Sequence, residues 1–335
     1  MSKAEGDPAA VYEALREEAG RVLIGNEEVL ERITIAALTG GHVLLEGVPG
    51  VAKTTIANLF ARATGLDFTR VQMTPDILPA DITGTQVYRE PTGEFELQRG
   101  PIFGNIVVAD EINRATPKAQ SALLEAMQEN HVTIDGETLP LPDPFMVIAT
   151  QNPIEMEGTF ELPEAQRDRF QFKLIVETPN QDDERQLLDR FDAEPTLDAD
   201  RIQQVVDEER IRSLREQVAD QYVDDSVKEY ILGIVEATRS SPDIDVGASP
   251  RATLTLMDAG KARAAIHGRG YVIPDDIKQL AKPVLRHRLI LSTDAELTDR
   301  SADAVIESIL QSVPATEPDD ASAHPREDEI PPSAE

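Results

Sequence analysis

Short apolar runs alternate with amphipathic stretches through the first half of the chain. Four such runs lie at His42–Leu45, Asn105–Ala109, Phe145–Thr150 and Phe172–Val176. Short continuous apolar runs are typical of strands that are buried on both faces of a parallel sheet. A segment with helical periodicity, Ile56–Thr64, lies between the first two runs. Two more, Asp7–Arg21 and Asn26–Leu38, precede the first run. The pattern therefore predicts an α/β domain over residues 1–177.

The second half of the chain has a different pattern. From Thr178 to Val313 the apolar positions repeat with a period of 3.6, as in Val227–Thr238 and Leu254–Ile266. This predicts a separate helical domain over residues 178–313. Residues 314–335 contain five prolines, many acids and no aromatic residue, so we predict a disordered acidic tail there.

Two insertions interrupt the α/β pattern. The first covers about residues 74–104 and holds Gly84, Gly93 and Gly100. The second covers residues 131–142 and places Asp135-Gly136 between two β-prone segments, which is a strong signal for a hairpin. Loops carry function but also tolerate insertions, so each insertion is either a contacting element or solvent-facing decoration.

A glycine-rich segment lies between the first predicted strand and the helix after it. It consists of Gly47, Val48, Pro49, Gly50, Val51, Ala52, Lys53, Thr54 and Thr55. This is the context of a phosphate-binding loop, in which backbone N–H groups and a helix N-terminus surround a phosphate chain. Lys53 is expected to reach the β and γ phosphates, and the Thr54 hydroxyl to bind Mg²⁺. An ordinary glycine-rich strand-to-helix turn is the alternative.

Ala52 stands where the general pattern G-x-x-x-x-G-K-[ST] has a glycine. We expect the φ angle of Ala52 to be negative, as in the first turn of a helix, where alanine carries no cost.

Polar side chains follow the second and third predicted strands. Asp110 and Glu111 come directly after Asn105–Ala109, and Asn152 comes two residues after Phe145–Thr150. Ligands of open α/β sheets bind at the carboxyl ends of the strands, so these residues are expected to face the phosphate-binding loop. Asp110 would hold Mg²⁺, Glu111 would polarise a water, and Asn152 would orient that water or touch the γ-phosphate. The alternatives are that Asp110 and Glu111 only end a strand in a very acidic protein, and that Asn152 is a turn residue before proline.

Arginines in two further segments are candidates for contacting phosphate. Arg167 and Arg169 lie just before the fourth predicted strand, and Arg251 lies in a helix that Ser249 and Pro250 are suited to begin. An arginine neutralises charge that develops on a transferring phosphoryl group, and one from a neighbouring subunit makes hydrolysis depend on assembly. Surface ion pairs are the alternative.

Several ordered segments resemble the MoxR family of AAA+ ATPases. They are Leu45–Thr54, Ala109–Glu129, Ala149–Phe170 and Ser249–Ala252, and the resemblance extends over about residues 10–290. An alanine before the lysine is normal in this family. The resemblance implies a P-loop AAA+ module with a parallel five-stranded sheet flanked by helices, followed by an all-α lid domain. It also implies membership of the helix-2-insert clade, with the two insertions as its insert and its hairpin, which would face the pore of a ring or a partner.

The resemblance assigns roles to residues of this chain. It implies that Lys53, Thr54, Asp110 and Glu111 form the ATP and Mg²⁺ site, and that Gly25 lies where the family contacts adenine. It makes Asn152 similar to sensor 1, Arg169 to the trans-acting finger and Arg251 to sensor 2. Arg167 stands where the family usually has an apolar residue, so either Arg167 or Arg169 could cross the subunit interface. Arg114 is a further candidate for that interface.

Composition limits the remaining possibilities. No apolar run is long enough to span a membrane, and the first residues lack the apolar core of a signal peptide, so we expect a cytoplasmic protein. The absence of cysteine excludes disulfides, cysteine metal sites and thiol nucleophiles. The net charge is −30, of which −24 remains when the residues from Glu317 onward are set aside. Self-repulsion on this scale is screened at molar salt, so we predict a halophilic archaeal host.

These observations favour an ATP-driven remodelling machine. The resemblance implies a ring, hexameric in form, that acts on client protein complexes or inserts cofactors and metals, with a von Willebrand factor A domain protein as partner. A nucleic-acid motor or a chelatase-type subunit is an alternative, but the second insertion is acidic where a nucleic-acid binder clusters Lys and Arg. An ATP-binding scaffold with little turnover is another, although Glu111, Asn152 and Arg169 are all present.

Overall fold

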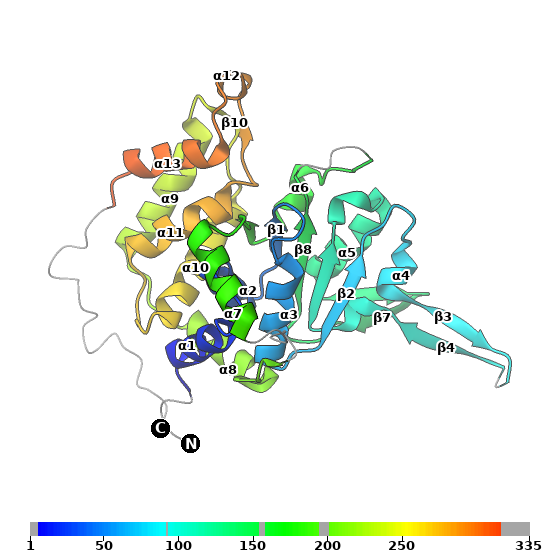
Figure 1. The fold of residues 1–335 in the computed structure, drawn as a ribbon. Coiled ribbons are helices and arrows are strands. Elements are labelled where there is room, and N and C mark those ends of the chain that lie inside the picture. Colours follow the sequence, from blue (N-terminus) through cyan, green and yellow to red (C-terminus); the bar gives the residue numbers. More distant parts are fainter. Residues whose placement is uncertain (1–5, 92, 154–157, 194–200, 316–335) are drawn as a thin grey trace. The chain divides into compact units, whose positions relative to one another are not determined.

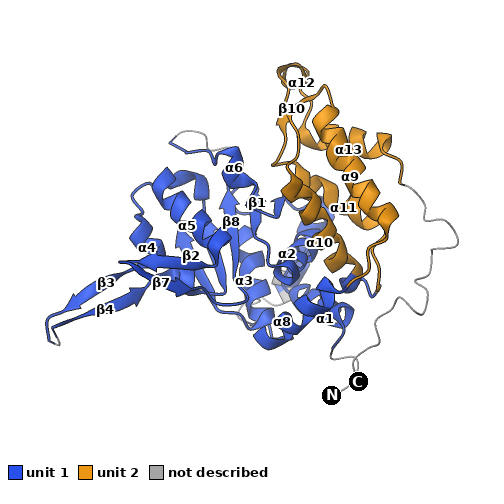
Figure 2. Ribbon diagram, turned by 180° about the vertical axis from the view of Figure 1, so that it is seen from behind, with its two compact units in different colours: residues 1–220, 265–268 blue, residues 221–264, 269–335 orange. Residues whose placement is uncertain are grey.

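The computed structural model describes residues 6–91, 93–153, 158–193 and 201–315 (Figure 1). The chain forms two compact units, residues 1–220 with 265–268 and residues 221–264 with 269–335 (Figure 2). The predicted disordered tail lies outside the described residues from position 316 onward. No helix of the described residues is long and apolar enough to cross a lipid bilayer.

The first unit contains a five-stranded parallel sheet with the strand order β2-β5-β8-β1-β9. The strands are β1 (Val43–Glu46), β2 (Phe68–Gln72), β5 (Ile106–Asp110), β8 (Met146–Gln151) and β9 (Phe172–Ile175). Four of them were predicted, and β5 is buried along its whole length. The sequence did not predict β2, which is an edge strand in which only Val71 is buried. Its polar positions hide the apolar signal on which strand prediction depends.

Helices cover both faces of the sheet. Those of the first unit are α1 (Pro8–Ala19), α2 (Glu27–Thr39), α3 (Lys53–Thr64), α4 (Pro79–Thr83), α5 (Pro117–Glu129), α6 (Glu164–Arg167), α7 (Gln181–Ala193) and α8 (Glu208–Ala219). Side chains of α5 pack against one face, where Val107, Val147 and Leu44 point. Helix α3 contacts β2, β5 and β8, and it begins at Lys53, as the phosphate-loop pattern predicts.

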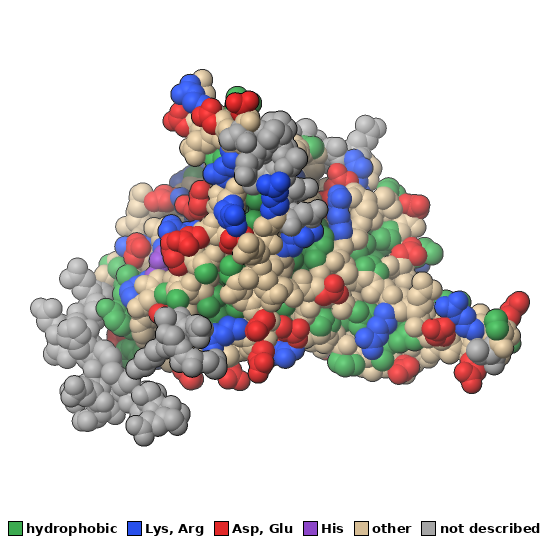
Figure 3. All heavy atoms as spheres, turned by 60° about the horizontal axis from the view of Figure 1, so that its bottom comes forward, with side chains coloured by type: hydrophobic (Ala, Val, Ile, Leu, Met, Phe, Trp, Pro, Cys, Tyr) green, Lys and Arg blue, Asp and Glu red, His purple; other side chains and the backbone are tan. Residues whose placement is uncertain are grey.

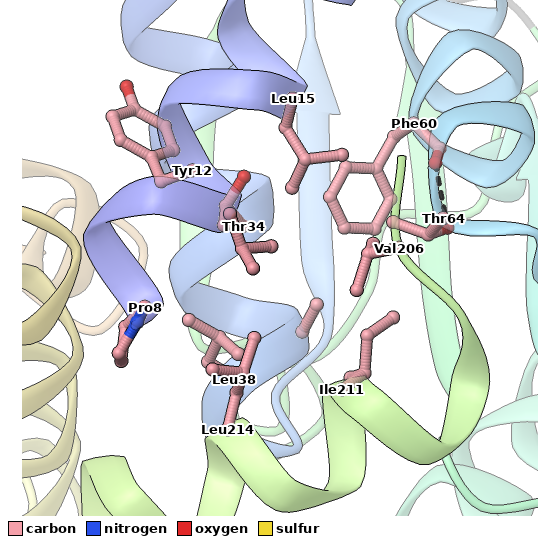
Figure 4. A pocket seen from close by; sticks show the side chains of 12 residues that line it. Pro8, Tyr12, Leu15, Thr34, Leu38, Phe60, Thr64, Val206, Ile211 and Leu214 are labelled. Carbon is pink, nitrogen blue, oxygen red and sulfur yellow. Dashed lines mark hydrogen bonds between the residues drawn. The ribbon is translucent and has the colours of Figure 1, made fainter. Parts of the chain in front are cut away.

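A small apolar cavity of about 10 Å³ lies among α1, α2, α3 and α8 (Figure 4). Leu15, Leu38, Phe60 and Ile211 are among the side chains around it. Its lining is almost entirely apolar and offers an ordered water no set of hydrogen-bonding partners, so the cavity is a packing gap.

The two predicted insertions form separate hairpins. The first contains α4, β3 (Gly84–Arg89), β4 (Glu94–Arg99) and the 3₁₀ helix η2 (Pro101–Phe103), and β3 and β4 project away from the sheet (Figures 1 and 2). The second pairs β6 (His131–Ile134) with β7 (Glu137–Pro140). Asp135 and Gly136 both have positive φ angles, 49° and 89°, as the predicted two-residue turn requires.

The second unit is mainly helical, as predicted. Its helices are α9 (Asp225–Ser240), α10 (Pro250–Ile266), α11 (Pro274–Leu285), α12 (Thr293–Leu297) and α13 (Ala302–Ser312). It differs from the all-α expectation in one respect, an antiparallel pair of short strands, β10 (Ile244–Val246) and β11 (Ile290–Leu291). The carboxylate of Asp276 is fully buried there and accepts hydrogen bonds from the guanidinium groups of Arg263 and Arg269.

The first unit continues beyond residue 177, where the pattern change suggested a domain boundary. Helices α7 and α8 belong to it because their region is bonded to the earlier helices. Arg215 Nε of α8 donates to the Ala37 carbonyl at 2.7 Å, and the Val205 N–H donates to the Ala63 carbonyl at 2.8 Å. Helical periodicity alone does not reveal which unit a helix packs against.

Candidate nucleotide-binding site

The parallel sheet brings the predicted site residues to one edge. The phosphate-loop segment follows β1, Asp110 ends β5, and Asn152 follows β8. Strands β5, β8 and β1 are adjacent and parallel, so their carboxyl ends lie side by side. Glu111 comes immediately after Asp110 and precedes the 3₁₀ helix η3 (Ile112–Arg114). The phosphate-loop segment, Asp110 and Asn152 are distant in sequence but come together at the edge where open α/β sheets bind ligands.

The loop between β1 and α3 has the backbone of a phosphate cradle. Gly50 has a φ angle of +87° and open space around it. Gly47 approaches β9 so closely that a Cβ would lie 2.5 Å from the Val176 carbonyl oxygen, so only glycine fits. The first amides of α3 have no partner within the helix and carry the positive end of its dipole.

Our expectation of a negative φ at Ala52 is wrong. Ala52 has φ 62° and ψ 21°, the left-handed conformation, because it is the residue before the helix and not part of its first turn. Here the chain reverses direction so that the helix can begin at Lys53. An L-residue in this region costs about 1–2 kcal/mol, which explains why the general pattern has glycine at this position.

Lys53 is folded back onto its own loop. Its Nζ donates hydrogen bonds to the carbonyl oxygen of Gly47 and, at 3.1 Å, to that of Val48. Partial burial lowers the pKa of Lys53, and the carboxylates of Asp110 and Glu111 oppose this shift. The two carboxylates thus stabilise the charged ammonium group of Lys53. Phosphate oxygens would replace the two loop carbonyls as acceptors.

Both carboxylate oxygens of Asp110 accept hydrogen bonds. Thr150 Oγ1 of β8 donates to Oδ1 at 2.5 Å, and the guanidinium of Arg70 on β2 donates to Oδ2, with Nε at 3.1 Å. Asp110 is only 8% exposed. A buried carboxylate is stable when charged only if donors or cations surround it, and these two neighbours meet that need.

Glu111 occupies an unusual backbone conformation at the end of β5. Its φ and ψ angles are 58° and 52°, in the left-handed region that non-glycine residues rarely adopt. Its N–H donates to Thr150 Oγ1 at 2.9 Å, and its Oε2 accepts from Gln72 Nε2 of β2 at 2.9 Å. Arg114 Nε lies 3.4 Å from Oε2. Backbone strain of this kind is concentrated at active sites, where surrounding contacts hold the residue in place.

A third carboxylate, that of Glu46, lies at the same edge. Lys173 Nζ of β9 forms an ion pair with Glu46 Oε2 at 2.9 Å, and Gln151 Nε2 donates to the same oxygen at 2.7 Å. Glu46 is the last residue of β1, so this ion pair holds the strand end from which the phosphate loop departs.

The remaining predicted residues lie in several places. Asn152 is buried directly after β8. Arg169 Nη1 donates to the Leu124 carbonyl of α5 at 2.5 Å, whereas Arg167 Nε is buried without a hydrogen-bond partner among the described residues. Gly25 precedes α2 with a φ angle of +70°, and a Cβ there would lie 3.0 Å from the carboxylate of Asp183. Arg251 is exposed in the first turn of α10, in the second unit.

The residues at the edge fit a magnesium nucleotide. Among the described residues, no group of three or more His, Cys, Asp or Glu side chains could hold a metal alone. Thr54 and Asp110 offer oxygen ligands only, which suits Mg²⁺, an ion that keeps several waters and is bound through one or two protein groups plus substrate phosphates. The left-handed turn at Gly50 and Ala52, together with Lys53, supplies the donors that the phosphates need.

Four side chains at this edge were missed by sequence reasoning, namely Glu46, Arg70, Gln72 and Thr150. Arg70 and Gln72 are two residues apart on an edge strand, so they point to the same side of β2. That spacing was a usable signal, but only after β2 had been identified as a neighbour of β5. Thr150 is the last residue of the predicted strand Phe145–Thr150, and a threonine there is equally typical of a strand that has no site role.

Comparisons with known proteins agree with this geometry. Residues 42–172 match the family described as "ATPase family associated with various cellular activities (AAA)", and residues 236–309 match an AAA lid domain. The chain is 47% identical to the uncharacterised protein YeaC of Bacillus subtilis, over 89% of this chain and 92% of that protein. It is 44% identical to the chaperone MoxR1 of Mycobacterium tuberculosis, over 92% of this chain and 84% of that protein.

A solved structure supports the same assignment. A protein from Cytophaga hutchinsonii, whose crystal structure is described as that of an ATPase, superposes with a TM-score of 0.85 at 40% identity. The match covers 92% of this chain and 96% of that one. Identity at this level over nearly the whole length of several relatives shows that the chain belongs to the MoxR family of AAA+ ATPases.

Proposed function

We propose that this chain hydrolyses Mg²⁺-ATP in a ring of subunits and uses the resulting motion to remodel, assemble or insert cofactors into client protein complexes. The observation that carries the proposal is the placement of Asp110 and the strained Glu111 beside the phosphate loop at one sheet edge. The name of the relative MoxR1, a chaperone, supports the remodelling part.

Each residue at the edge has a role that follows from its chemistry. Lys53 and the loop amides bind the β and γ phosphates, while Thr54 and Asp110 hold Mg²⁺. When bound, Mg²⁺ draws negative charge from the phosphate oxygens. Glu111 accepts a hydrogen bond from the attacking water and positions it.

Asn152 completes the hydrolytic part of the site. As an uncharged group it orients the water or contacts the γ-phosphate without trapping the product by charge. The nucleotide-binding residues are the loop positions 47–55, and Gly25 is assigned to the base.

Assembly supplies the remaining positive charge. Arg169 acts across the interface on the phosphate of the neighbouring subunit, with Arg167 as the alternative and Arg114 as a further interface residue. In the single chain Arg169 is bonded to the Leu124 carbonyl, a neutral acceptor that a phosphate would replace with a stronger one. Arg251 contributes from the lid as sensor 2.

The wider setting follows from family membership and from charge. We assign the chain to the helix-2-insert clade, with β3–β4 and β6–β7 as the inserts. We also assign it a hexameric ring and a partner with a von Willebrand factor A domain. Its location is assigned as the cytoplasm of a halophilic archaeon. The exposed rings of Tyr88 and Phe95, 5.4 Å apart on the projecting hairpin, support a protein-contacting role for the insert. The net charge of −30 supports the halophilic assignment, and Figure 3 shows acidic side chains interspersed with basic ones on one face.

The test is the rate of ATP hydrolysis as a function of protein concentration, in high-KCl buffer with Mg²⁺, while light scattering reports the molar mass. We expect the specific activity to rise as the ring forms. Arg169→Ala is expected to lower the rate by roughly 10³-fold or more without loss of ATP binding, the range seen for trans-acting arginines.

Arg167→Ala is the matched control, because it removes the neighbouring guanidinium from the same short segment. If Arg167→Ala abolished turnover and Arg169→Ala did not, the two roles would be exchanged. A monomer that binds ATP but does not hydrolyse it at any concentration would contradict the proposal and favour a nucleotide-binding scaffold.

A further inference from the structure

Arg70 contacts the carboxylate that is assigned to Mg²⁺. Its Nε donates to Asp110 Oδ2 at 3.1 Å, and its Nη2 forms a second hydrogen bond to the same oxygen. Arg70 lies on β2, the edge strand next to β5, with its backbone opposite Val108. The guanidinium group therefore crosses from one strand to the next to reach the end of β5.

Asp110 needs a compensating cation when no metal is bound. Its side chain is 12% exposed, and Thr150 is a neutral donor that satisfies only Oδ1. Leaving a charged carboxylate without a cation in such a place is strongly destabilising. The Arg70 guanidinium supplies this charge through a direct ion pair, whereas Lys53, which is coupled electrostatically to Asp110, donates its hydrogen bonds to loop carbonyls.

Arg70 is free to leave, whereas Thr150 is not. The side chain of Arg70 is 52% exposed, and its only other hydrogen bond to a described residue is a long one, 3.4 Å, to Gln72 Oε1. Thr150 is 1% exposed and is fixed within β8. Displacing Arg70 from Asp110 therefore requires a side-chain rotation into solvent and no movement of the sheet.

We propose that Arg70 is a positioning residue that occupies Asp110 in the absence of Mg²⁺ and is displaced when Mg²⁺ arrives with the nucleotide. The inference rests on the proposed function, because it assumes that Asp110 serves Mg²⁺. Two cations of like charge compete for one carboxylate, so Arg70 weakens Mg²⁺ binding. It also recaptures Asp110 when the metal leaves, which favours release of Mg²⁺-ADP.

The first test uses neither metal nor nucleotide. In EDTA-containing buffer, Arg70→Met is expected to lower the midpoint of thermal unfolding by about 4 °C, the shift that corresponds to loss of a charge-assisted hydrogen bond. In the Asp110→Asn background the same substitution is expected to change the midpoint by about 1 °C or less, since the carboxylate that it compensates is gone. Equal shifts in both backgrounds would overturn the proposed pairing.

The second test measures Mg²⁺ directly. A fluorescent ADP analogue is titrated with Mg²⁺, and the Mg²⁺ concentration that gives half of the metal-dependent signal is compared between variants. Arg70→Met is expected to lower this concentration by about tenfold, and Arg70→Lys, which keeps the charge but loses the guanidinium geometry, by less. An unchanged or raised Mg²⁺ requirement in Arg70→Met would overturn the proposal.

Arg89→Met is the matched control. Arg89 is a comparably exposed strand arginine of the same unit, paired with Glu96 at 2.7 Å on the projecting hairpin. It is expected to leave the Mg²⁺ requirement unchanged. Failure of the wild-type chain to bind the ADP analogue in a Mg²⁺-dependent way would overturn the proposed function itself. Wild-type binding without an effect of Arg70→Met would overturn only the inference about Arg70.

Discussion

Gln72 Nε2 on β2 donates a hydrogen bond of 2.9 Å to Glu111 Oε2, which is the carboxylate assigned to activate water. The amide occupies an oxygen that a water molecule would otherwise approach. Gln72 thus holds the Glu111 side chain toward the edge strand. In the pairing of β2 with β5, Gln72 lies opposite Asp110. The two site carboxylates are each restrained by one residue of β2, since Arg70 restrains Asp110 in the same way.

The contact predicts that Gln72 limits basal turnover. Gln72→Leu removes the donor while it keeps the approximate size of the side chain. We expect the ATPase rate at saturating ATP to rise by about fivefold to tenfold, which corresponds to the net contribution of about 1 kcal/mol of a typical exposed hydrogen bond. The measurement is kcat in high-KCl buffer, with the KM for ATP unchanged.

Gln86→Leu is the control. It makes the same substitution on another strand of the same unit, the hairpin strand β3. A fall in kcat for Gln72→Leu would contradict the restraining role and would show that the amide positions Glu111 productively.

Glu111→Gln tests the assigned chemistry of the carboxylate. The variant keeps the shape of the side chain and loses its negative charge and its basicity. We expect hydrolysis to fall by roughly 10²- to 10⁴-fold, the contribution of a general base, while ATP binding remains. Lys53→Ala is expected to lose binding itself, because it removes the cation that contacts the phosphates. A normal hydrolysis rate in Glu111→Gln would rule out Glu111 as the catalytic base.

Much of the fold was predictable because β1, β5, β8 and β9 are short apolar runs that end at polar residues. The edge strand β2 was not, since three of its five residues are polar and its one neighbour in the sheet, β5, is distant in sequence. The same reason hid part of the site. Arg70 and Asp110 are 40 positions apart, so no local pattern relates them. Sequence patterns predict a side chain that follows a buried strand, but they do not predict the group that holds that side chain in place.

Ala52 shows a second limit of prediction. Its departure from the general pattern is evident in the sequence, but the sign of its φ angle depends on whether helix α3 includes it. Helix ends are uncertain by one or two residues in sequence, and here one residue decides between a relaxed and a strained backbone.

Ala52→Gly is therefore expected to stabilise the chain. Glycine adopts the left-handed conformation without the crowding that an alanine Cβ causes, although its freer unfolded state offsets part of the gain. We expect a net gain of about 1 kcal/mol, which raises the thermal midpoint of the first unit by about 2 °C. Differential scanning calorimetry measures this shift.

Ala122→Gly in the interior of α5 is the matched control. It makes the same substitution where the backbone is helical, and it is expected to lower the midpoint by a similar amount. A loss of stability in both variants would contradict the strain assigned to Ala52.

The acidic composition predicts a stability that depends on salt. With a net charge of −30, repulsion among carboxylates opposes the compact state in dilute buffer. At 1 M salt the Debye length is about 3 Å, so this repulsion is screened. We expect the thermal midpoint to rise by on the order of 10 °C between 0.1 and 2 M KCl. Sucrose of equal osmolality is the control, and an equal rise in sucrose would show that screening is not the cause.

His42 predicts a pH dependence of stability. Its ring is buried beside β8, where Nδ1 accepts the Val147 N–H at 3.0 Å and Nε2 lies 3.0 Å from the Met127 carbonyl oxygen. These contacts require the neutral ring with its proton on Nε2. Burial lowers the pKa of His42 from 6.5 to about 4, while the hydrogen bond to Met127 opposes the shift and the charge of Arg215 adds to it.

The sign of the effect follows from the proton count. Between pH 6.5 and 4 the unfolded chain binds a proton at His42 that the folded chain does not bind, so stability is fully present above pH 6.5 and declines as the pH falls. The loss that is due to this group approaches about 3 kcal/mol near pH 4.

Carboxylates titrate in the same range, so the prediction concerns the difference between the wild-type chain and His42→Asn. The asparagine carbonyl can still accept the Val147 N–H but does not titrate. We expect denaturant unfolding to give a free energy that falls less steeply from pH 6.5 to 4.5 in His42→Asn, and parallel curves for the two proteins would show that His42 is not responsible.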